Sequence, residues 1–232
     1  MKVAVVTGIF NPKNNIRIKY SKYYKEYDYY CFTCDSDKIA VDSNIKRVVM
    51  SSDSWDSKYA ARRAGKMPKM LQHLLLPDYD VYVWCDATHE ISVGMTELKS
   101  ILGENDCAMF KHPQRDCVYD ELNVVSRDNL DHSSLLNETR NWLSSIGFEG
   151  HKGLYEMTTF VRRNNKKCNN AFSVWYSLVA RLSSRDQLTF MPCSFKYDLS
   201  IATLPGSAQM YNGGNEVFSQ VRHSLRLTKT VS

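Results

Sequence analysis

VYVWCDATHEI, from Val81 to Ile91, begins as an unbroken apolar run and then presents an acid, a hydroxyl, a histidine and a second acid. A short run without charges is typical of a strand that is covered on both faces, as strands are in parallel sheets. Open parallel sheets bind their ligands outside the carboxyl ends of their strands. The stretch therefore predicts that Asp86 lies at the ligand-binding edge of a central strand.

Strands and helices alternate along the rest of the chain. Runs rich in β-branched or aromatic residues predict strands over residues 3–10, 27–35, 44–50, 81–86, 107–112 and 153–163. Helical composition or periodicity predicts helices over 96–103, 133–148 and 168–182, and two short helices between 58 and 77. The alternation predicts an α/β fold with a mostly parallel central sheet and helices on both faces.

The composition fits one soluble domain. The chain has 232 residues, 43% of them apolar, and no linker rich in Pro, Gly or Ser divides it. We expect a single domain over residues 1–232, with a C-terminal tail over 217–232. No stretch approaches the ~20 apolar residues that span a bilayer, and no signal-peptide cleavage site follows the first strand. The seven cysteines favour reduced thiols in a cytoplasm, and the Cys31–Cys34 pair lacks the second pair of a zinc site.

A basic segment precedes the Val81 strand. Between Ser57 and Pro77 the chain has no acid, whereas it carries Lys58, Arg62, Arg63, Lys66 and Lys69. A compact phosphate ligand suits this charge, although a solvated basic helix face would have the same composition. The segment lacks the interleaved aromatic residues of a nucleic-acid stacking platform, and the net charge of the whole chain is +5. We therefore expect a small anionic ligand and no nucleic acid.

The acid at the mouth of the Val81 strand has the chemistry of a metal ligand. Asp86 is followed by the hydroxyl of Thr88, and two such oxygens can hold a hard divalent cation that neutralises a diphosphate. A loop acid that only caps the next element is the alternative. Two literal Asp-x-Asp triplets compete. Asp78-Tyr79-Asp80 precedes its strand and should form a turn at the opposite edge, whereas Asp35, of Asp35-Ser36-Asp37, is assigned to the nucleoside end of a ligand.

Several blocks in a fixed order carry a resemblance. They are VAVVTG, ARRAGKMPKMLQHLLLP, DYDVYVWCDAT, FKHPQRDCVYDE, GLYEMTTFVRR and SSRDQLTF, and they run from Met1 to Asp198. Together they resemble a family of glycosyltransferases with the GT-A fold, long catalogued as a domain of unknown function. That family includes plant cell-wall homologues and a chlorella-virus capsid glycosyltransferase domain. The resemblance implies a UDP-sugar donor of the UDP-rhamnose or UDP-glucose type, a Mn²⁺ or Mg²⁺ ion, and a glycan or glycoprotein acceptor.

The resemblance also gives roles to the polar residues. A departing diphosphate needs a positive field, which a metal and the basic segment would supply. The expected donor-binding residues are Gly8, Asp35, Arg63, Lys66, Lys69, Asp86 and Thr88. The expected metal ligands are Asp86, Thr88 and His223, although the family has a full Asp-x-Asp where this chain has Asp86-Ala87-Thr88, and a surface histidine is more often without a ligand.

On the acceptor side, a hydroxyl must lose a proton, and a carboxylate is the usual base in sugar chemistry. Asp186 is the expected base of an inverting transfer, although Ser184 and Gln187 fit a capping box that would start a helix there. The expected acceptor-binding residues are His112, Arg115 and Glu156. A capped helix, with Cys117, Val118 and Leu122 facing inward, explains the acids after His112 equally well. An ion pair with an arginine is the alternative for Glu156.

Two other classes of protein remain open at this point. A nucleotidyltransferase that makes sugar nucleotides would also place a metal at a strand end. It should carry a glycine-rich loop after its first strand, where this chain has Gly8 followed by IFNPKNN. A non-catalytic carbohydrate-binding domain would need neither the basic segment nor an acid at the mouth of a buried strand. We therefore expect a metal-dependent glycosyltransferase.

Overall fold

The computed structural model of the chain describes residues 1–10, 12, 15–18, 23, 25–34, 38–50, 58–209 and 212–221. Two of the predicted site residues, Asp35 and His223, lie outside these described residues. None of the helices within them combines the length and the apolar content that a membrane span requires.

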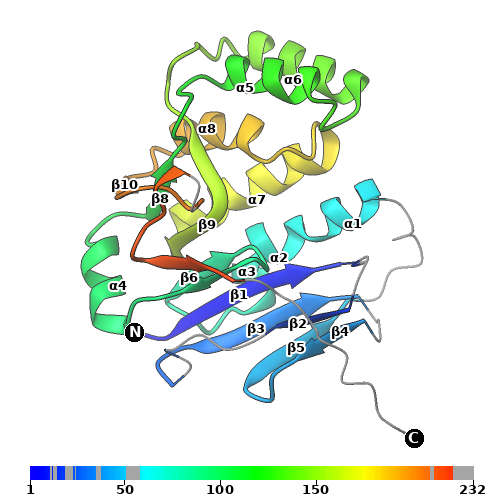
Figure 1. Ribbon diagram of the computed structural model, residues 1–232. Coiled ribbons are helices and arrows are strands. Elements are labelled where there is room, and N and C mark those ends of the chain that lie inside the picture. Colours follow the sequence, from blue (N-terminus) through cyan, green and yellow to red (C-terminus); the bar gives the residue numbers. More distant parts are fainter. Residues whose placement is uncertain are drawn as a thin grey trace, which may run out of the picture.

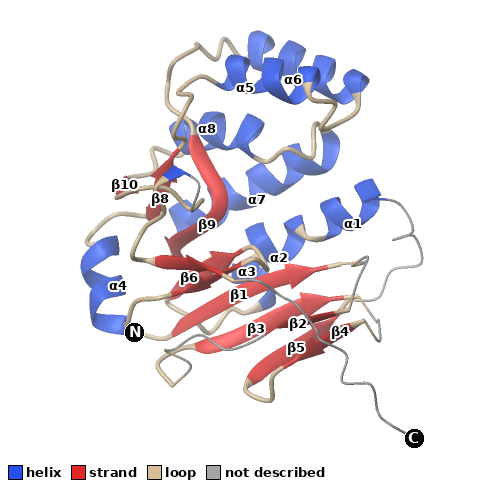
Figure 2. Ribbon diagram, in the orientation of Figure 1, coloured by secondary structure: helices blue, strands red, loops and turns tan. Residues whose placement is uncertain are grey.

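The core is a seven-stranded sheet with the order β10-β8-β9-β6-β1-β3-β5 (Figures 1 and 2). Its strands are β1 (Val3–Ile9), β3 (Asp28–Thr33), β5 (Ile45–Val49), β6 (Val81–Cys85), β8 (Cys107–Lys111), β9 (Tyr155–Arg163) and β10 (Ile201–Leu204). Within this sheet β9 runs antiparallel to both of its neighbours, β6 and β8, and the other pairs are parallel. The predicted α/β fold with a mostly parallel sheet is thereby confirmed.

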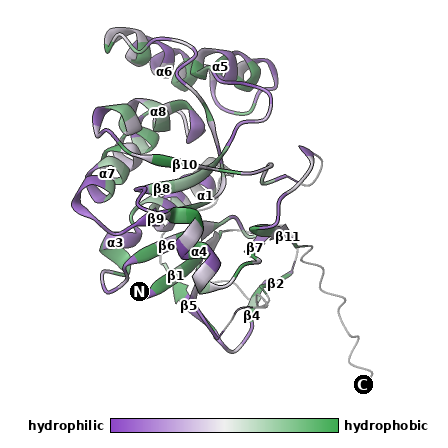
Figure 3. Cartoon of the chain, turned by 90° about the vertical axis from the view of Figure 1, so that its left-hand side faces the viewer, coloured by the Kyte–Doolittle hydropathy of each residue, from purple (hydrophilic) through white to green (hydrophobic). Residues whose placement is uncertain are grey.

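Each face of the sheet is covered differently. On one face, α2 (Lys66–Met70), α7 (Lys166–Arg181) and α8 (Gln187–Lys196) share a core with β1, β6 and β9. On the other face lie α4 (Met95–Leu102) and two small sheets, which pair β2 (Ile16–Ile18) with β4 (Ile39–Val41) and β7 (His89–Ile91) with β11 (Phe218–Gln220). The central strands are mostly hydrophobic in Figure 3 because both of their faces are covered.

The remaining helices extend the first face. α5 (Val118–Arg127) and α6 (Ser133–Ser145) lie beyond α8, at the top of Figure 1, and pack around Leu188 of α8. The inward-facing Val118 and Leu122 confirm the helix that the sequence offered as an alternative for this segment. The basic segment forms three short helices rather than two, namely α1 (Lys58–Ala64), α2 and α3 (Gln72–Leu75).

The reversed strand brings distant segments to one edge of the sheet. Because β9 runs against β6 and β8, its amino end lies beside their carboxyl ends. The amide of Asp86 accordingly donates to Thr158 O, and the amide of His112 donates to Leu154 O, each at 2.8 Å. Asp80 lies at the opposite edge, where its Oδ2 accepts a hydrogen bond from the amide of Lys2 at 2.6 Å. The interpretation of Asp78-Tyr79-Asp80 as a turn away from the ligand edge is therefore correct.

Candidate functional site

Two cavities open at the edge where β1 and β6 end. The large cavity, of about 680 Å³, is lined by Gly8, Ile9, Phe10, Pro12, Lys38, Ala61, Arg62, Gly65, Lys66, Lys69, Trp84 and Asp86. The small cavity, of about 400 Å³, has a mostly polar wall that includes His112, Arg115, Glu121, Glu156, Arg185, Asp186, Gln187 and Gln209. Lys66, Lys69 and Asp86 line both cavities, so the two cavities meet at these three side chains.

Gly8 lies in the wall of the large cavity at the end of β1. A Cβ atom added there would come within 3.3 Å of ring carbons of both Phe10 and Trp84. That separation is tighter than nearly all real Cβ contacts, so any side chain would push the two aromatic rings aside. The glycine thus allows the backbone of β1 to approach the rings that shape this cavity.

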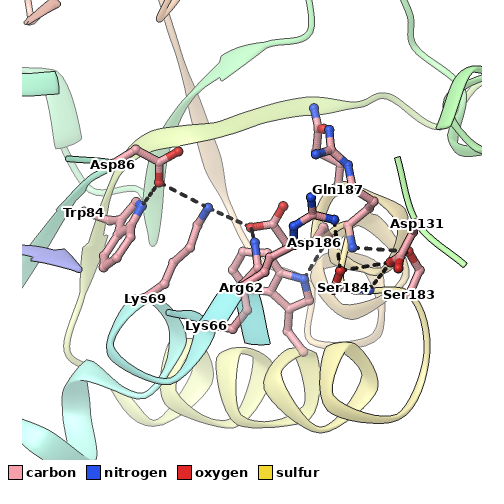
Figure 4. Close-up of polar contacts among 12 residues, drawn as sticks. Arg62, Lys66, Lys69, Trp84, Asp86, Asp131, Ser183, Ser184, Asp186 and Gln187 are labelled. Atoms are coloured by element: carbon pink, nitrogen blue, oxygen red, sulfur yellow. Dashed lines mark hydrogen bonds and ion pairs between the residues drawn. The ribbon is translucent and has the colours of Figure 1, made fainter. Parts of the chain in front are cut away.

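Asp86 is oriented by its own strand. The indole Nε1 of Trp84, two residues earlier on β6, donates a hydrogen bond to Asp86 Oδ1 at 2.8 Å (Figure 4). Trp84 itself is buried, whereas the Asp86 side chain is 45% exposed. The carboxylate is therefore held in one orientation at the junction of the cavities while remaining accessible to a ligand.

Two lysines from α2 converge on a second carboxylate beside Asp86. The Nζ atoms of Lys66 and Lys69 each lie 2.7 Å from Asp186 Oδ2. Lys69 Nζ also lies 3.8 Å from Asp86 Oδ1 and 5.6 Å from the ring centroid of Trp84. Lys69 and Asp186 are both buried, and pairing offsets the cost of removing such charges from water. Figure 4 shows the resulting row of charges, which runs from Asp86 through Lys69 to Asp186, with Lys66 beside Asp186.

The pairing changes how these groups titrate. Burial by itself would raise the pKa of Asp186, but Lys66 and Lys69 outweigh that effect and hold it well below its usual range. Burial lowers the pKa of Lys66, a shift that Asp186 opposes and Lys69 reinforces. As long as both ammonium groups contact it, Asp186 is a carboxylate with little tendency to accept a proton.

The loop before α8 fixes the position of Asp186. Asp131 Oδ2 accepts hydrogen bonds from Ser183 Oγ at 2.8 Å and from the amide and Oγ of Ser184 at 2.7 and 2.9 Å. Trp175 Nε1 donates to the carbonyl of Asp186 at 3.0 Å. The predicted capping box is wrong, because Ser184 is bound to Asp131 and the residue at the N-cap of α8 is Asp186, without a side-chain cap.

Arg63 lies elsewhere than the sequence suggested. Its guanidinium donates to the carbonyls of Val179 and Ala180 at 2.6 Å and of Leu182 at 2.9 Å, at the carboxyl end of α7. Cations at this end of a helix satisfy its free carbonyls and favour its dipole. Arg63 lines neither cavity, whereas its neighbour Arg62 lines the large one.

Thr88 directs its hydroxyl away from Asp86. His89 Nε2 lies 2.9 Å from the carbonyl of Ala208 and must donate to it, which leaves Nδ1 as an acceptor. Thr88 Oγ1 lies 3.0 Å from that Nδ1 and donates to it. Thr88 is exposed and lines neither cavity. Among the predicted metal ligands that fall in described positions, Asp86 is therefore the one at the cavities.

His112 and Arg115 form a closed group on the wall of the small cavity. Arg115 Nε donates to Glu121 Oε2 at 2.7 Å, and Glu121 is buried. His112 Nδ1 accepts from the amides of Gln114 and Arg115 at 3.2 and 3.1 Å, and its Nε2 lies 3.0 Å from Arg115 Nη2. Burial lowers the pKa of His112, and Arg115 lowers it further, so the ring is neutral. The sequence did not point to Glu121 as the partner of Arg115.

Glu156 lies at the amino end of β9 and has neutral partners. Ser207 Oγ lies 3.0 and 3.1 Å from its two carboxylate oxygens, and the amide of Ala208 donates to Oε2 at 2.7 Å. The expected ion pair with an arginine is not formed among the described residues. Burial raises the pKa of Glu156, although these hydrogen bonds oppose the shift. Glu156 thus anchors the 207–208 segment while it lines the small cavity.

The surroundings of Asp86 fit a divalent cation. Mg²⁺ is often held by one or two carboxylates together with phosphate oxygens of the ligand. Asp86 is an oriented, accessible carboxylate, and the ammonium groups of Lys66 and Lys69 line the same cavities. A different group, Cys117, Asp120 and His151, has ligand atoms within 4.8 Å of one another, but none of the three lines either cavity. In the Cys31–Cys34 pair, burial raises the pKa of Cys31 to about 12, which disfavours a thiolate ligand.

The sheet and its cavities define an open α/β protein whose two cavities lie at the carboxyl edge of its strands, where such folds bind their ligands. Over residues 1–223 the chain matches the model of a family described as TOD1/MUCI70, glycosyltransferase-like domain. The chain therefore belongs to this glycosyltransferase-like family, and the predicted relationship is confirmed. Among curated protein sequences, none matches the chain.

Two solved structures are similar to this chain. Mouse xyloside xylosyltransferase 1, in its apo form, has a TM-score of 0.46 and 9% identity, and the match covers 88% of this chain and 85% of that one. The bifunctional glycosyltransferase WbbM, also in its apo form, has a TM-score of 0.46 and 13% identity, with 88% and 39% of the two chains covered. The family assignment itself comes from the match over residues 1–223.

Proposed function

We propose that this protein transfers a sugar from a nucleotide-diphosphate sugar, of the UDP-sugar type, to a hydroxyl group of a glycan acceptor. The observation that carries the proposal is the position of Lys66, Lys69 and Asp86 at the junction of the two cavities. A group that passes from one bound molecule to another must cross such a junction. Membership of a glycosyltransferase-like family supports the same class of reaction.

The large cavity suits the donor. Its volume of about 680 Å³ is typical of small-molecule sites, and it combines the aromatic surface of Phe10 and Trp84 with two ammonium groups. Asp35 stays a proposed contact for the nucleoside. His223 stays a proposed ligand from the 217–232 tail, and one observation supports it. The amide of Val221 donates to Thr88 O at 2.8 Å, so the chain before His223 is attached to the loop that follows Asp86.

The small cavity suits the acceptor. In the proposed reaction the bond between the anomeric carbon and the diphosphate oxygen breaks, and a bond from the acceptor oxygen to that carbon forms. Lys66 and Lys69 stabilise the negative charge on the departing diphosphate. A Mn²⁺ or Mg²⁺ ion bound at Asp86 would add positive charge there. The acceptor proton passes to the Asp186 carboxylate, which lines the small cavity, so we propose inversion at the anomeric carbon.

The proposal is tested with purified protein and a panel of UDP-sugars. Released UDP is measured with and without Mn²⁺, and isothermal titration with UDP measures binding directly. We expect UDP to bind more tightly with Mn²⁺, and one sugar nucleotide to be hydrolysed faster than the others. Failure of UDP to bind under both conditions would remove the proposed donor. Metal-dependent binding without hydrolysis or transfer from any member of the panel would favour a non-catalytic binding domain instead.

A further inference from the structure

The counter-ion of the two lysines is itself a feature that needs an explanation. A phosphate-binding lysine usually reaches a ligand from solvent, whereas the buried Lys69 and the partly buried Lys66 both contact a carboxylate of the protein, at 2.7 Å each. A diphosphate that binds in the large cavity must compete with Asp186 for the same two ammonium groups. Asp186 is therefore an anion of the protein itself that competes with the proposed ligand for Lys66 and Lys69.

Asp186 and the proposed diphosphate site lie in different cavities. Lys66 and Lys69 line both cavities, but Asp186 lines the small cavity alone. The lysines thus stand between an anion on the small-cavity side and a space for an anion on the large-cavity side. Asp186 is also fixed from behind, because Trp175 Nε1 donates to its carbonyl and Asp131 anchors the two serines that precede it. The flexible lysine ends can change partner without movement of the α8 loop.

We infer that Asp186 is a stand-in anion: it holds Lys66 and Lys69 in position in the free protein until the donor diphosphate replaces it as their partner. This inference rests on the proposed function and deepens it. Without a counter-ion, the two neighbouring ammonium groups would repel each other. With Asp186 in place, both are held at the junction of the cavities, each 2.7 Å from Asp186 Oδ2.

The exchange has a consequence for the order of events. Once the diphosphate neutralises the lysines, Asp186 loses the two charges that suppress its basicity. Its carboxylate then faces the small cavity as an acceptor for the proton of the incoming hydroxyl. Donor binding therefore prepares the base, and the donor must bind before the acceptor can react.

The decisive variant is Asp186→Asn, which keeps the shape of the side chain and removes the competing charge. Isothermal titration without metal compares UDP with uridine, which lacks the diphosphate. We expect Asp186→Asn to bind UDP about tenfold more tightly than the wild type does, a conservative value for close charge pairs at an interface. Uridine affinity should stay within about twofold of the wild-type value, because no phosphate is involved.

A matched control separates this effect from general damage. Asp106→Asn also removes a buried carboxylate that is paired with a lysine, since Lys167 Nζ lies 2.9 Å from Asp106 Oδ2, but it does so at the opposite edge of the sheet. Both variants should lower the melting temperature of the free protein. Saturating UDP should raise the melting temperature of Asp186→Asn more than that of the wild type or of Asp106→Asn.

A measurement on the wild type covers the case in which Asp186→Asn does not fold. The carboxyl ¹³C resonance of Asp186 is followed during acid titration, with and without UDP. We expect UDP to raise the titration midpoint of this group. A midpoint that UDP does not change would overturn the inference, as would unchanged or weaker UDP binding by a folded Asp186→Asn. Absence of UDP binding by the wild type would overturn the proposed function as well, so the two failures are distinguishable.

Discussion

Arg162 and Lys69, which is paired with the partly buried Lys66, are buried cations on the same face of the sheet, yet their surroundings differ. Arg162 lies between the rings of Tyr82 and Phe172, each centroid at 4.6 Å. Its guanidinium contacts neutral groups, including Gln72 Oε1 at 2.9 Å and Asn169 Oδ1 at 3.0 Å. The lysines contact a carboxylate and face two cavities. Burial of a positive charge is common to both places and does not distinguish a binding site from a structural element.

The distinguishing property is whether the partner of the cation can be exchanged. Burial lowers the pKa of Arg162 to about 10, which still leaves it charged at neutral pH, and its partners Gln72 and Asn169 line neither the large nor the small cavity. Any replacement of those partners would require the core to open. The partners of the lysines lie at a cavity wall, where a dissolved anion can replace them. Each of the following predictions tests one side of this comparison.

The largest effect is expected from Arg162→Met, which keeps an apolar stem between the two rings and removes the donors. The buried Gln72 Oε1 and the partly buried Asn169 Oδ1 would then lose this donor, and the free energy of unfolding should fall by about 3–5 kcal/mol. Urea denaturation measures the loss. Arg127→Met is the control, because Arg127 is 71% exposed and its solvent-screened pair with Asp128 should contribute little to stability. Equal losses in both variants would contradict the structural role of Arg162.

The second effect is on ligand binding and leaves the core intact. Asp86→Ala should weaken Mn²⁺-dependent UDP binding by about 100-fold, because the oriented carboxylate is lost, while the free energy of unfolding changes little. Isothermal titration with and without Mn²⁺ measures this. Asp80→Ala, at the opposite edge, should bind UDP and Mn²⁺ as the wild type does. A large loss of binding in Asp80→Ala would show that the metal ligand had been assigned to the wrong acid.

The third effect concerns how Asp106, at the sheet edge opposite the two cavities, makes the free energy of unfolding depend on pH. Burial alone would raise the pKa of Asp106, but Lys167, Ser200 and Asn165 lower it from 3.8 to about 2. A lowered folded-state pKa stabilises the protein above the unfolded value, and this stability is lost as the pH falls through 3.8 towards 2. Asp106→Asn should therefore be less stable by about 2 kcal/mol at pH 7, and the difference should vanish near pH 2. A difference that is independent of pH would mean that the charge is not responsible.

The smallest effect concerns one lysine of the exchangeable pair. Lys69→Met should weaken UDP binding by about tenfold, the lower limit for a hydrogen bond between charged groups, and should leave uridine binding unchanged. Lys66 would remain to contact the diphosphate, which limits the loss. Competition of UDP and uridine for a fluorescent nucleotide measures both affinities. Equal weakening of the two ligands would indicate damage to the cavity rather than loss of a phosphate contact.

The sequence predicted the central strands well because β1 and β6 are covered on both faces and carry an unmistakable apolar pattern. It missed β10, with four residues, and the three-residue strands β2, β4, β7 and β11, because such short elements contain at most two periods of alternation. Asp86 was found because it directly follows a buried strand, where topology alone fixes the edge.

The rest of the site depended on contacts between distant segments. Arg62 and Arg63 are adjacent in the same basic run, and only the turn of α1 decides that Arg62 lines the large cavity while Arg63 binds the end of α7. The link from Asp131 to Ser184 joins residues far apart in the chain, and no local pattern indicated it. Trp84 had a detectable signal, since it precedes Asp86 by two residues and so lies on the same face of the strand.

The order of the residues along the chain divides the two cavities into separate halves of the polypeptide. The large cavity is lined by residues 8–86, whereas the small cavity takes its other wall residues from 112–209, and the shared Lys66, Lys69 and Asp86 belong to the first half. A recombination point just after Asp86 would thus keep one complete cavity and replace most of the other. Under the proposed assignment of the donor to the large cavity and the acceptor to the small one, chimeras of family members joined there should change acceptor preference more than donor preference.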